Sequence, residues 1–544
     1  MRDVGSVEGT TAAETARPRR LARAATIVML FFLASRILGL VRDIVISHQF
    51  GTSRALDAYF AAFNVPDFIF NVIAGGALGS AFIPTFAAAL AVGDARRAWR
   101  LASAVINLVL ILMTAIAAIL AIFATPIVAA TVARGFEPAD QALTATLMRW
   151  MLITPIVFGV SGIVMGILNA HQHFVLPALA PALYNMAIIA GALFLAPTMG
   201  VYGLAASVVV GAFLHLFIQV PWFIRRGFQI SDFRFEIFNL QSAICNLQSA
   251  DVREVGRLML PRTFGIAAVQ INFLVNTILA SALSAGRIAA LSYAWRLMLL
   301  PVGIVGQSLA TAIFPTFSEQ NARNELDDFR STFSTAFRVT LYLAIPATVG
   351  LFVLGGPLVA LVFQRGEFDA QSTAETAWAL QFYSVALFAH SGLEIVTRAF
   401  YAMHDTKTPV IIGVGAMALN IGLSVALIAP LAHGGLALAN SIATILEMLL
   451  LLLILRRRMI GIDDRRIALS IARVGVGALV MGAALVAFAN VFAARGAIFV
   501  AVAGAVLGVV VYLGVTAALR SEEIVFVLRK FKIINRKDAK DAKF

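Results

Sequence analysis

The most unusual residues of the chain are charged side chains inside an otherwise apolar stretch. Residues 25–47 are long and apolar enough to cross a bilayer, yet they contain Arg36, Arg42 and Asp43. On an α-helix, these three and the neighbouring serines fall within an arc of about 140°, and aliphatic residues fill the rest. A lone arginine at mid-bilayer costs at least ~2.5–3.5 kcal/mol. We therefore expect this strip to face protein or water, where it could line a cavity.

The strip carries a net positive charge, which favours an anion as its ligand. Two guanidinium groups stand beside one carboxylate, and arginine is suited to bidentate contact with phosphate. Arg296, just before Pro301 in a later apolar stretch, could add another cation. The alternative is that Asp43 forms a purely structural pair with a neighbouring arginine. Secondary candidates for the same polar site are Arg262, Gln270, Asn272 and Asn276.

Other charged positions have two interpretations each. Asp57 begins the next apolar stretch, where it could stabilise a helix N-terminus or pair with Arg42 or Arg54. Glu394 and Arg398 are four residues apart on one helical face. They are a possible part of the site, but we favour a self-neutralising i,i+4 pair.

The sequence holds no motif of an enzyme or a nucleotide site. HExxH, GxSxG and P-loop patterns are absent from it, and one cysteine, Cys245, excludes an internal disulfide. We expect no catalysis, no cofactor and no metal site, and a transport step driven by Na⁺, H⁺ or the membrane potential. The net charge of +13 could suggest a nucleic-acid partner. In a membrane protein such charges mark cytoplasmic loops, so no nucleic acid is expected.

Composition places the chain among multi-pass membrane proteins. Of its 544 residues, 60% are hydrophobic and only 13% are charged, and the apolar stretches recur to its far end. We expect an all-α protein of about fourteen transmembrane helices. The predicted spans are 25–47, 57–91, 101–124, 143–168, 174–196, 200–224, 258–283, 287–316, 333–362, 374–402, 407–431, 433–455, 467–491 and 496–518. The second, eighth and ninth are overlong and contain prolines, so kinks or tilts are expected there.

The distribution of lysine and arginine predicts the orientation. With the N-terminus in the cytoplasm, the cytoplasmic segments hold 29 of the 42 basic residues and the outer loops hold 5. This asymmetry follows the positive-inside rule and predicts that both termini are cytoplasmic.

An internal repeat divides most of the chain in two. Pro177 and Pro409 are 232 residues apart, as are the "GLAAS" at Gly203 and the "GLALA" at Gly435. We expect two parallel six-helix lobes related by a pseudo-two-fold axis, plus two C-terminal helices. The expected segments are an N-terminal arm 1–24, an N-lobe 25–224, a linker 225–257, a C-lobe 258–455, helices 13 and 14 in 456–518, and a basic tail 519–544.

Several motifs resemble the MurJ (MviN) lipid II flippases of the multidrug/oligosaccharidyl-lipid/polysaccharide exporter superfamily. They are S-R-x-x-G-x-x-R-D at 35–43, "AFIPTF" at 81–86, Y-x-x-R-L-x-x-x-P at 293–301, "FQRGEFDA" at 363–370 and "FYAMHDTKTPV" at 400–410. The resemblance covers nearly the whole chain. It implies a flippase of a lipid-linked peptidoglycan precursor, of the undecaprenyl-pyrophosphate type, in the bacterial inner membrane, with cell-wall synthesis enzymes as partners. It also implies that the functional charges are Arg36, Arg42, Asp43, Asp57 and Arg296, with the arginines on the pyrophosphate.

One stretch departs from the family pattern. Where the family has L-R-R-x-x-A-E-G-A, this chain reads "FIFNVIAGGA", so Phe70 and Asn71 replace arginines and Gly76 replaces a glutamate. This keeps other exporters open as alternatives: a flippase of another lipid-linked oligosaccharide, or a cation-drug antiporter, against which the arginine strip argues. A membrane scaffold without transport is a third alternative.

Overall fold

The computed structural model describes residues 31, 34–74, 76–225 and 249–524. The arm 1–24, most of the linker 225–257 and most of the tail 519–544 lie outside these residues. The chain forms two compact units, residues 1–50 with 54–274 and residues 51–53 with 275–544. The first unit contains a helix over residues 34–50, α2 (Arg54–Ile69), α3 (Gly76–Ala91), α4 (Ala95–Ile122), α5 (Ala124–Ala130), α6 (Pro138–Met151), α7 (Ile153–Ala170), α8 (Val175–Ala190), α9 (Ala196–Met199), α10 (Val201–Phe217), α11 (Val220–Arg225) and most of α13 (Ala250–Ser281).

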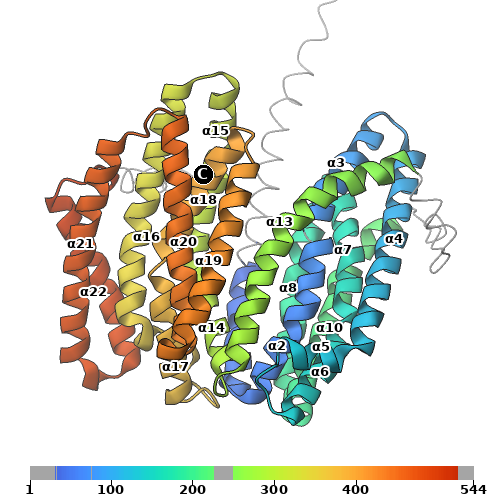
Figure 1. Cartoon of the computed structure of the whole chain (residues 1–544), viewed down its shortest axis with the longest axis horizontal. Helices are drawn as coiled ribbons and strands as arrows, with labels where there is room; N and C mark the ends of the chain where they lie inside the picture. The colour runs from blue at the N-terminus through green and yellow to red at the C-terminus, as the bar shows by residue number, and fades with distance from the viewer. Residues whose placement is uncertain (1–30, 32–33, 75, 226–248, 525–544) are drawn as a thin grey trace, which may run out of the picture. The chain divides into compact units, whose positions relative to one another are not determined.

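The second unit contains the remaining helices, which are labelled on the ribbon in Figure 1. They are α14 (Arg287–Val302), α15 (Ser308–Ala322), α16 (Leu326–Phe363), α17 (Ala370–Ser384), α18 (Leu387–Ala402), α19 (Lys407–Leu431), α20 (His433–Arg458), α21 (Asp464–Val491) and α22 (Ala497–Ala518).

The described residues contain ten helices long and apolar enough to cross a membrane, or eleven if the bent pair α17–α18 is one span. The three remaining predicted spans coincide with the helix over 34–50, with α2–α3 and with α13. The predicted all-α, multi-pass fold is therefore confirmed. The long apolar stretches were enough to predict helices, because a backbone that crosses hydrocarbon must satisfy its hydrogen bonds internally, as an α-helix does.

The overlong spans differ in how they accommodate their length. A π-helical turn, Phe70–Ala74, interrupts the second span after Pro66, and another, Gly303–Gln307, interrupts the eighth after Pro301. These breaks fit the expected effect of a proline, which removes one helical hydrogen bond. The ninth span instead remains one helix of 38 residues. The tenth bends by 44° between α17 and α18, although neither helix contains a proline.

The repeat also appears in the backbone. Left-handed residues end helices at Gln172 and again at His404, and at Gly200 and again at Ala432, each pair 232 residues apart. Close backbone contacts recur at the same interval. A Cβ atom on Gly203 would lie 2.7 Å from the carbonyl carbon of Leu195, and one on Gly435 would lie 2.2 Å from the carbonyl oxygen of Leu427. Glycine is required at both positions because any side chain would collide with backbone.

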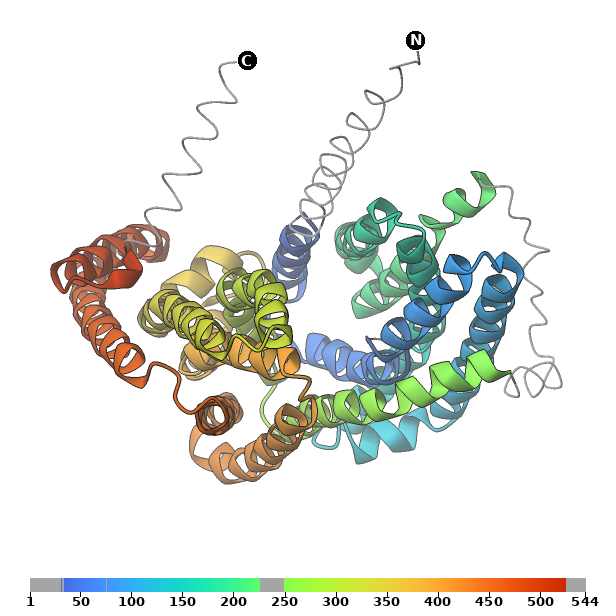
Figure 2. The same ribbon diagram turned by 90° about the horizontal axis from the view of Figure 1, so that it is seen from above.

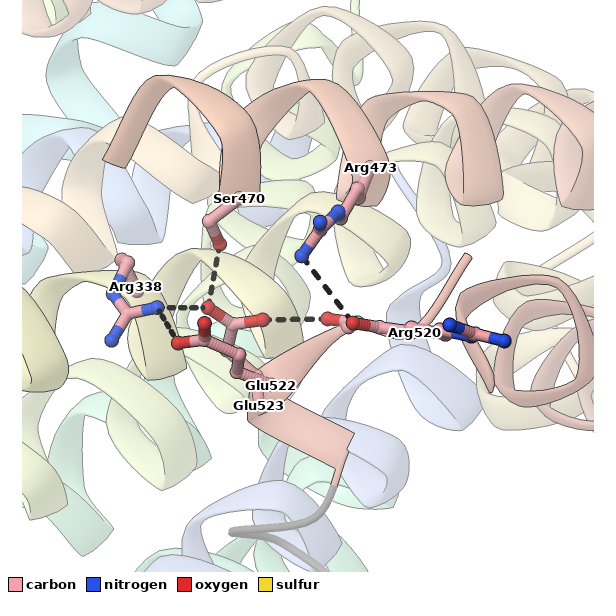
Figure 3. A network of polar contacts seen from close by, with 7 residues as sticks. Arg338, Ser470, Arg473, Arg520, Glu522 and Glu523 are labelled. Atoms are coloured by element: carbon pink, nitrogen blue, oxygen red, sulfur yellow. Dashed lines mark hydrogen bonds and ion pairs between the residues drawn. The ribbon is translucent and has the colours of Figure 1, made fainter. Parts of the chain in front are cut away.

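The C-terminal helices α21 and α22 pack against α16 at the edge of the second unit (Figures 1 and 2). A C-terminal ion network joins these helices at one end (Figure 3). Arg338 Nη1 lies 3.0 Å from carboxylate oxygens of both Glu522 and Glu523, and Ser470 Oγ donates to Glu523 at 2.9 Å. Further along, the Tyr512 hydroxyl donates to the carbonyl of Tyr342 at 2.7 Å. Polar contacts therefore fix α21 and α22 to α16, in addition to apolar packing.

Asp405 caps the start of α19 and gives a pH-dependent prediction. Burial raises its pKa, but hydrogen bonds from Thr408 and Arg458 outweigh this and hold the pKa at about 2. An unfolded aspartate has a pKa near ~3.9. Because the folded pKa is the lower one, the contribution to stability is present above about pH 4 and is lost as the pH falls towards about 2. We expect the unfolding temperature of Asp405→Asn to fall less than that of the wild type as the pH is lowered from about 4 to about 2. An equally steep loss in the variant would contradict this assignment.

Candidate functional site

The helix over residues 34–50 buries the C-terminal part of its polar strip, which holds Asp43 and Ser47. Asp43 and Ser47 are 3% and 0% exposed, whereas the aliphatic Ile37 and Val41 are 55% and 38% exposed. Arg36 lies on the exposed surface of the described chain. The acidic part of the strip is therefore packed within the first unit, and the aliphatic face is available to lipid.

Arg42 is held by three hydrogen bonds within the first unit. Its Nε and Nη2 donate to Asp43 Oδ1 at 3.1 and 2.9 Å, and its Nη1 donates to Asn185 Oδ1 on α8 at 3.0 Å. The side chain of Arg42 is 19% exposed and that of Asp43 is 5% exposed. The structural pairing of Asp43 with an arginine, which the sequence left open, is thus formed. This pairing fixes the plane of the Arg42 guanidinium in a largely buried position. Its charge is screened less there than in water.

Asn185 is a site residue that the sequence analysis missed. Besides accepting from Arg42, it donates through Nδ2 to the carbonyl of Ser35 at 3.2 Å, so it ties both ends of the charged strip to α8. Its Nδ2 would lie 3.9 Å from a Cβ on Gly39, which shows how closely the two helices approach. The sequence feature that could have identified Asn185 is its amide within an otherwise apolar span, because a buried amide requires hydrogen-bond partners.

Replacing Asn185 with leucine should therefore destabilise the protein. The change removes the acceptor for a largely buried guanidinium, and an unsatisfied buried partner costs about 1–3 kcal/mol. We expect a lower midpoint of thermal unfolding in detergent. Asn64→Leu is the matched control, because Asn64 donates to Phe60 within its own helix. Equal losses from both substitutions would argue against a special role for Asn185.

Asp57 lies in the first turn of α2 and is fully buried. Arg54 Nη1 is 3.8 Å from its carboxylate, and the same guanidinium reaches Asp140 through Nε at 3.9 Å and stacks on the Phe136 ring at 4.6 Å. Both interpretations of Asp57 thus have a structural basis, with Arg54 as a partner within its own helix.

The departure from the family pattern lies in the π-helical turn of the second span. The Phe70 ring packs on Phe158 at 5.3 Å, and Asn71 Nδ2 donates to the carbonyl of Asp67 at 2.9 Å. Phe70 and Asn71 are therefore engaged in aromatic packing and a local hydrogen bond. The side chain at position 76 lies outside the described residues.

The other expected residues are divided between the two units. Arg296 is half-buried on α14, and its neighbour Trp295 packs on the rings of Tyr383 and His390 at 5.2 and 5.5 Å. Ser424 donates to Asn276 at 3.3 Å and lies the same distance from Asn420. Gln270 is half-buried on α13 in the first unit, and the side chain of Arg262 is outside the described residues.

The expected pair between Glu394 and Arg398 is wrong. Among the described residues, these two side chains form no ion pair, although they are four residues apart on α18. The guanidinium of Arg398 lies instead over the Phe314 ring, 5.8 Å from its centre. Correct spacing permits an i,i+4 pair, but a neighbouring helix offers the guanidinium an aromatic face.

Comparison with known proteins agrees with this architecture. The family model described as "Lipid II flippase MurJ" matches residues 46–507, which includes Asp57 and Arg296 and begins just after Asp43. The chain is 32% identical to "Probable lipid II flippase MurJ" of Haemophilus influenzae over 475 residues, covering 83% of this chain and 90% of that protein. It is also 32% identical to "Lipid II flippase MurJ" of Burkholderia cenocepacia, covering 80% of this chain and 84% of that protein.

Solved structures show the same fold. One described as "Lipid II flippase MurJ, inward closed conformation" superposes with a TM-score of 0.76 at 25% identity, covering 90% of this chain and 98% of that one. An inward-facing multidrug resistance MATE transporter has a TM-score of 0.67 at 17% identity, covering 81% and 99%, which shows a shared fold alone. Together with the match over residues 46–507, these relationships establish that the chain belongs to the lipid II flippase MurJ family.

Proposed function

We propose that this protein flips lipid II, the lipid-linked peptidoglycan precursor, across the bacterial cytoplasmic membrane. The observation that carries the proposal is the family match over residues 46–507. The membrane-spanning fold and the charged helix before the match are consistent with it. Two relatives at 32% identity bear the name of lipid II flippase.

In this proposal the arginines bind the pyrophosphate of the substrate. Asp43 and Asn185 hold the Arg42 guanidinium in one plane, which lowers the entropy lost when it grips a phosphate through two hydrogen bonds. Arg36 and Arg296 would add charge, because one carboxylate already offsets Arg42. Substrate would enter from the cytoplasmic leaflet, with both termini in the cytoplasm, as the charge asymmetry of the loops suggests.

Transport would run without catalysis by the protein itself. Since the sequence holds no nucleotide-binding motif, we propose coupling to the membrane potential or to a Na⁺ or H⁺ gradient. A potential of about 100 mV supplies ~2.3 kcal/mol for each charge moved. Cell-wall synthesis enzymes are the proposed partners that would consume the product.

Complementation tests the proposal directly. The wild-type chain, expressed in bacterial cells depleted of their own lipid II flippase, should restore growth and normal shape. Membrane-inserted protein that fails to do so would overturn the assignment.

A second candidate is a flippase of another polyprenyl-pyrophosphate-linked oligosaccharide. The sequence feature that motivates it is that Phe70 and Asn71 are uncharged where the resemblance to the family implies arginines. Native mass spectrometry of the purified protein with lipid II and with such a competitor separates the two. Preferential retention of lipid II supports the first proposal, and preference for the competitor supports the second.

A further inference from the structure

The loop between α20 and α21 exposes one large apolar residue between two that are buried. Met459 and Ile462 are 2% and 3% exposed and belong to one hydrophobic cluster of the second unit. Ile460, between them, is 87% exposed. Met459 and Ile462 thus anchor the loop to the hydrophobic core, and the anchored backbone directs the Ile460 side chain outward.

The backbone of Ile460 is strained in this position. Its φ is +54°, in the left-handed region, and Gly461 and Asp463 also have positive φ values. A β-branched residue is rarely found there, because its branched Cβ crowds the backbone. Such strain persists where surrounding structure or function maintains it.

Five arginines surround Ile460, and they fall into two groups. Arg456 pairs with Asp464 at 2.9 Å, and Arg458 pairs with Asp405 at 2.5 Å. The other three arginines are exposed and form no ion pair with any described residue: Arg457, Arg465 and Arg466. Two of the five arginines are therefore paired with carboxylates, and with the exposed Asp463 of the loop also counted the local excess of positive charge is two.

The loop lies at the end of two membrane-spanning helices. α20 and α21 are both long and apolar enough to cross the bilayer. Leu453 and Leu469, near the loop on these helices, are 52% and 47% exposed, as expected for lipid-facing residues. A loop at this level meets lipid headgroups, with hydrocarbon one or two turns away.

We propose that the loop Met459–Asp463 and the three exposed arginines that flank it, Arg457, Arg465 and Arg466, bind anionic phospholipid of the adjoining leaflet. The arginines contact the headgroup phosphates, and Ile460 inserts between lipids. This extends beyond substrate transport, because the ligand is a bulk membrane lipid at the rim of the second unit. The arginines complement the negative charge of lipid phosphates, and an exposed isoleucine is more stable among acyl chains than in water. Together these two features favour a lipid surface as the binding partner of the loop.

The experiment measures how phosphatidylglycerol changes the thermal unfolding midpoint of the full-length protein in neutral detergent, with phosphatidylcholine of the same acyl chains as reference. Only phosphatidylglycerol should raise the midpoint. In the triple variant R457Q/R465Q/R466Q, its apparent affinity should fall at least about tenfold, since each basic residue near an anionic surface contributes to binding. Glycerol phosphate without acyl chains should have no effect, and an equal rise with it would overturn the assignment to a lipid.

A matched triple variant, R96Q/R253Q/R257Q, removes the same charge from exposed arginines of the first unit. It should retain the wild-type affinity, and an equal loss in both triples would reduce the effect to net charge and overturn the proposal. Ile460→Gly provides the second test. Relief of the left-handed strain should raise its midpoint without lipid, while its response to phosphatidylglycerol weakens. An undiminished response would show that Ile460 does not insert.

Discussion

Arg42→Ala should abolish complementation of flippase-depleted cells. The substitution removes a cation proposed to grip the substrate pyrophosphate. It also leaves Asp43, whose side chain is 5% exposed, without the guanidinium that donates two hydrogen bonds to it. Breaking a buried ion pair costs up to about 3–5 kcal/mol, so part of the loss could be a folding defect. Growth after depletion and the amount of membrane-inserted protein must both be measured.

The double variant R42A/D43N separates these two effects. It removes both charges, including the buried carboxylate that Arg42→Ala leaves without its guanidinium, so it should recover much of the lost unfolding temperature. It should still fail to complement, because no guanidinium remains at this position. Arg42→Lys should restore function only in part, since an ammonium group cannot make the planar, bidentate contact. A double variant that complements as well as wild type would exclude Arg42 from transport and favour the scaffold interpretation.

Glu523→Ala should produce the largest loss of stability among single substitutions outside the charged helix. Glu523 is 3% exposed and receives hydrogen bonds from Arg338 at 3.0 Å, Ser470 at 2.9 Å and Ser521 at 2.5 Å. Among the described residues, its removal leaves the guanidinium of Arg338, 11% exposed, with the more exposed Glu522 as its one carboxylate partner. We expect a cost of about 3–5 kcal/mol, visible as a lower unfolding midpoint in detergent.

Arg330→Ala is the control for this substitution. Arg330 lies on the same helix, α16, and pairs at 2.8 Å with Asp327, which is 95% exposed. Exposed pairs contribute about 0–1 kcal/mol, so the midpoint should barely move. If the two variants shift the midpoint by similar amounts, the C-terminal ion network does not fix α21 and α22 to α16.

Loss of Glu523 should also alter the response to acid. Burial raises the pKa of Glu523, but hydrogen bonds from Ser521 and Ser470 and the charge of Arg338 outweigh burial and lower the pKa overall. The stabilisation is therefore present above the unfolded value of ~4.3 and is lost as the pH falls below it.

The sequence alone determined the membrane fold, the repeat and the burial of Asp43 and Ser47 in the charged strip. Each depends on local patterns: apolar length, a recurring offset, and the position of charges around a single helix. The cost of placing a charge in hydrocarbon is large enough to set the orientation of a helix before any partner is known. This is why Asp43 and Ser47 were expected to face inward, and why the structure buries them.

Only the tertiary structure decided which groups meet. Asn185 is 143 residues from Arg42, and Glu523 is 185 residues from Arg338, so no periodicity connects them. Conversely, Glu394 and Arg398 have the spacing of a pair, yet Arg398 stacks on Phe314 of another helix. Local spacing determines which contacts are possible within a helix. Packing between helices determines which contacts form, because a side chain takes the partner that three-dimensional proximity offers.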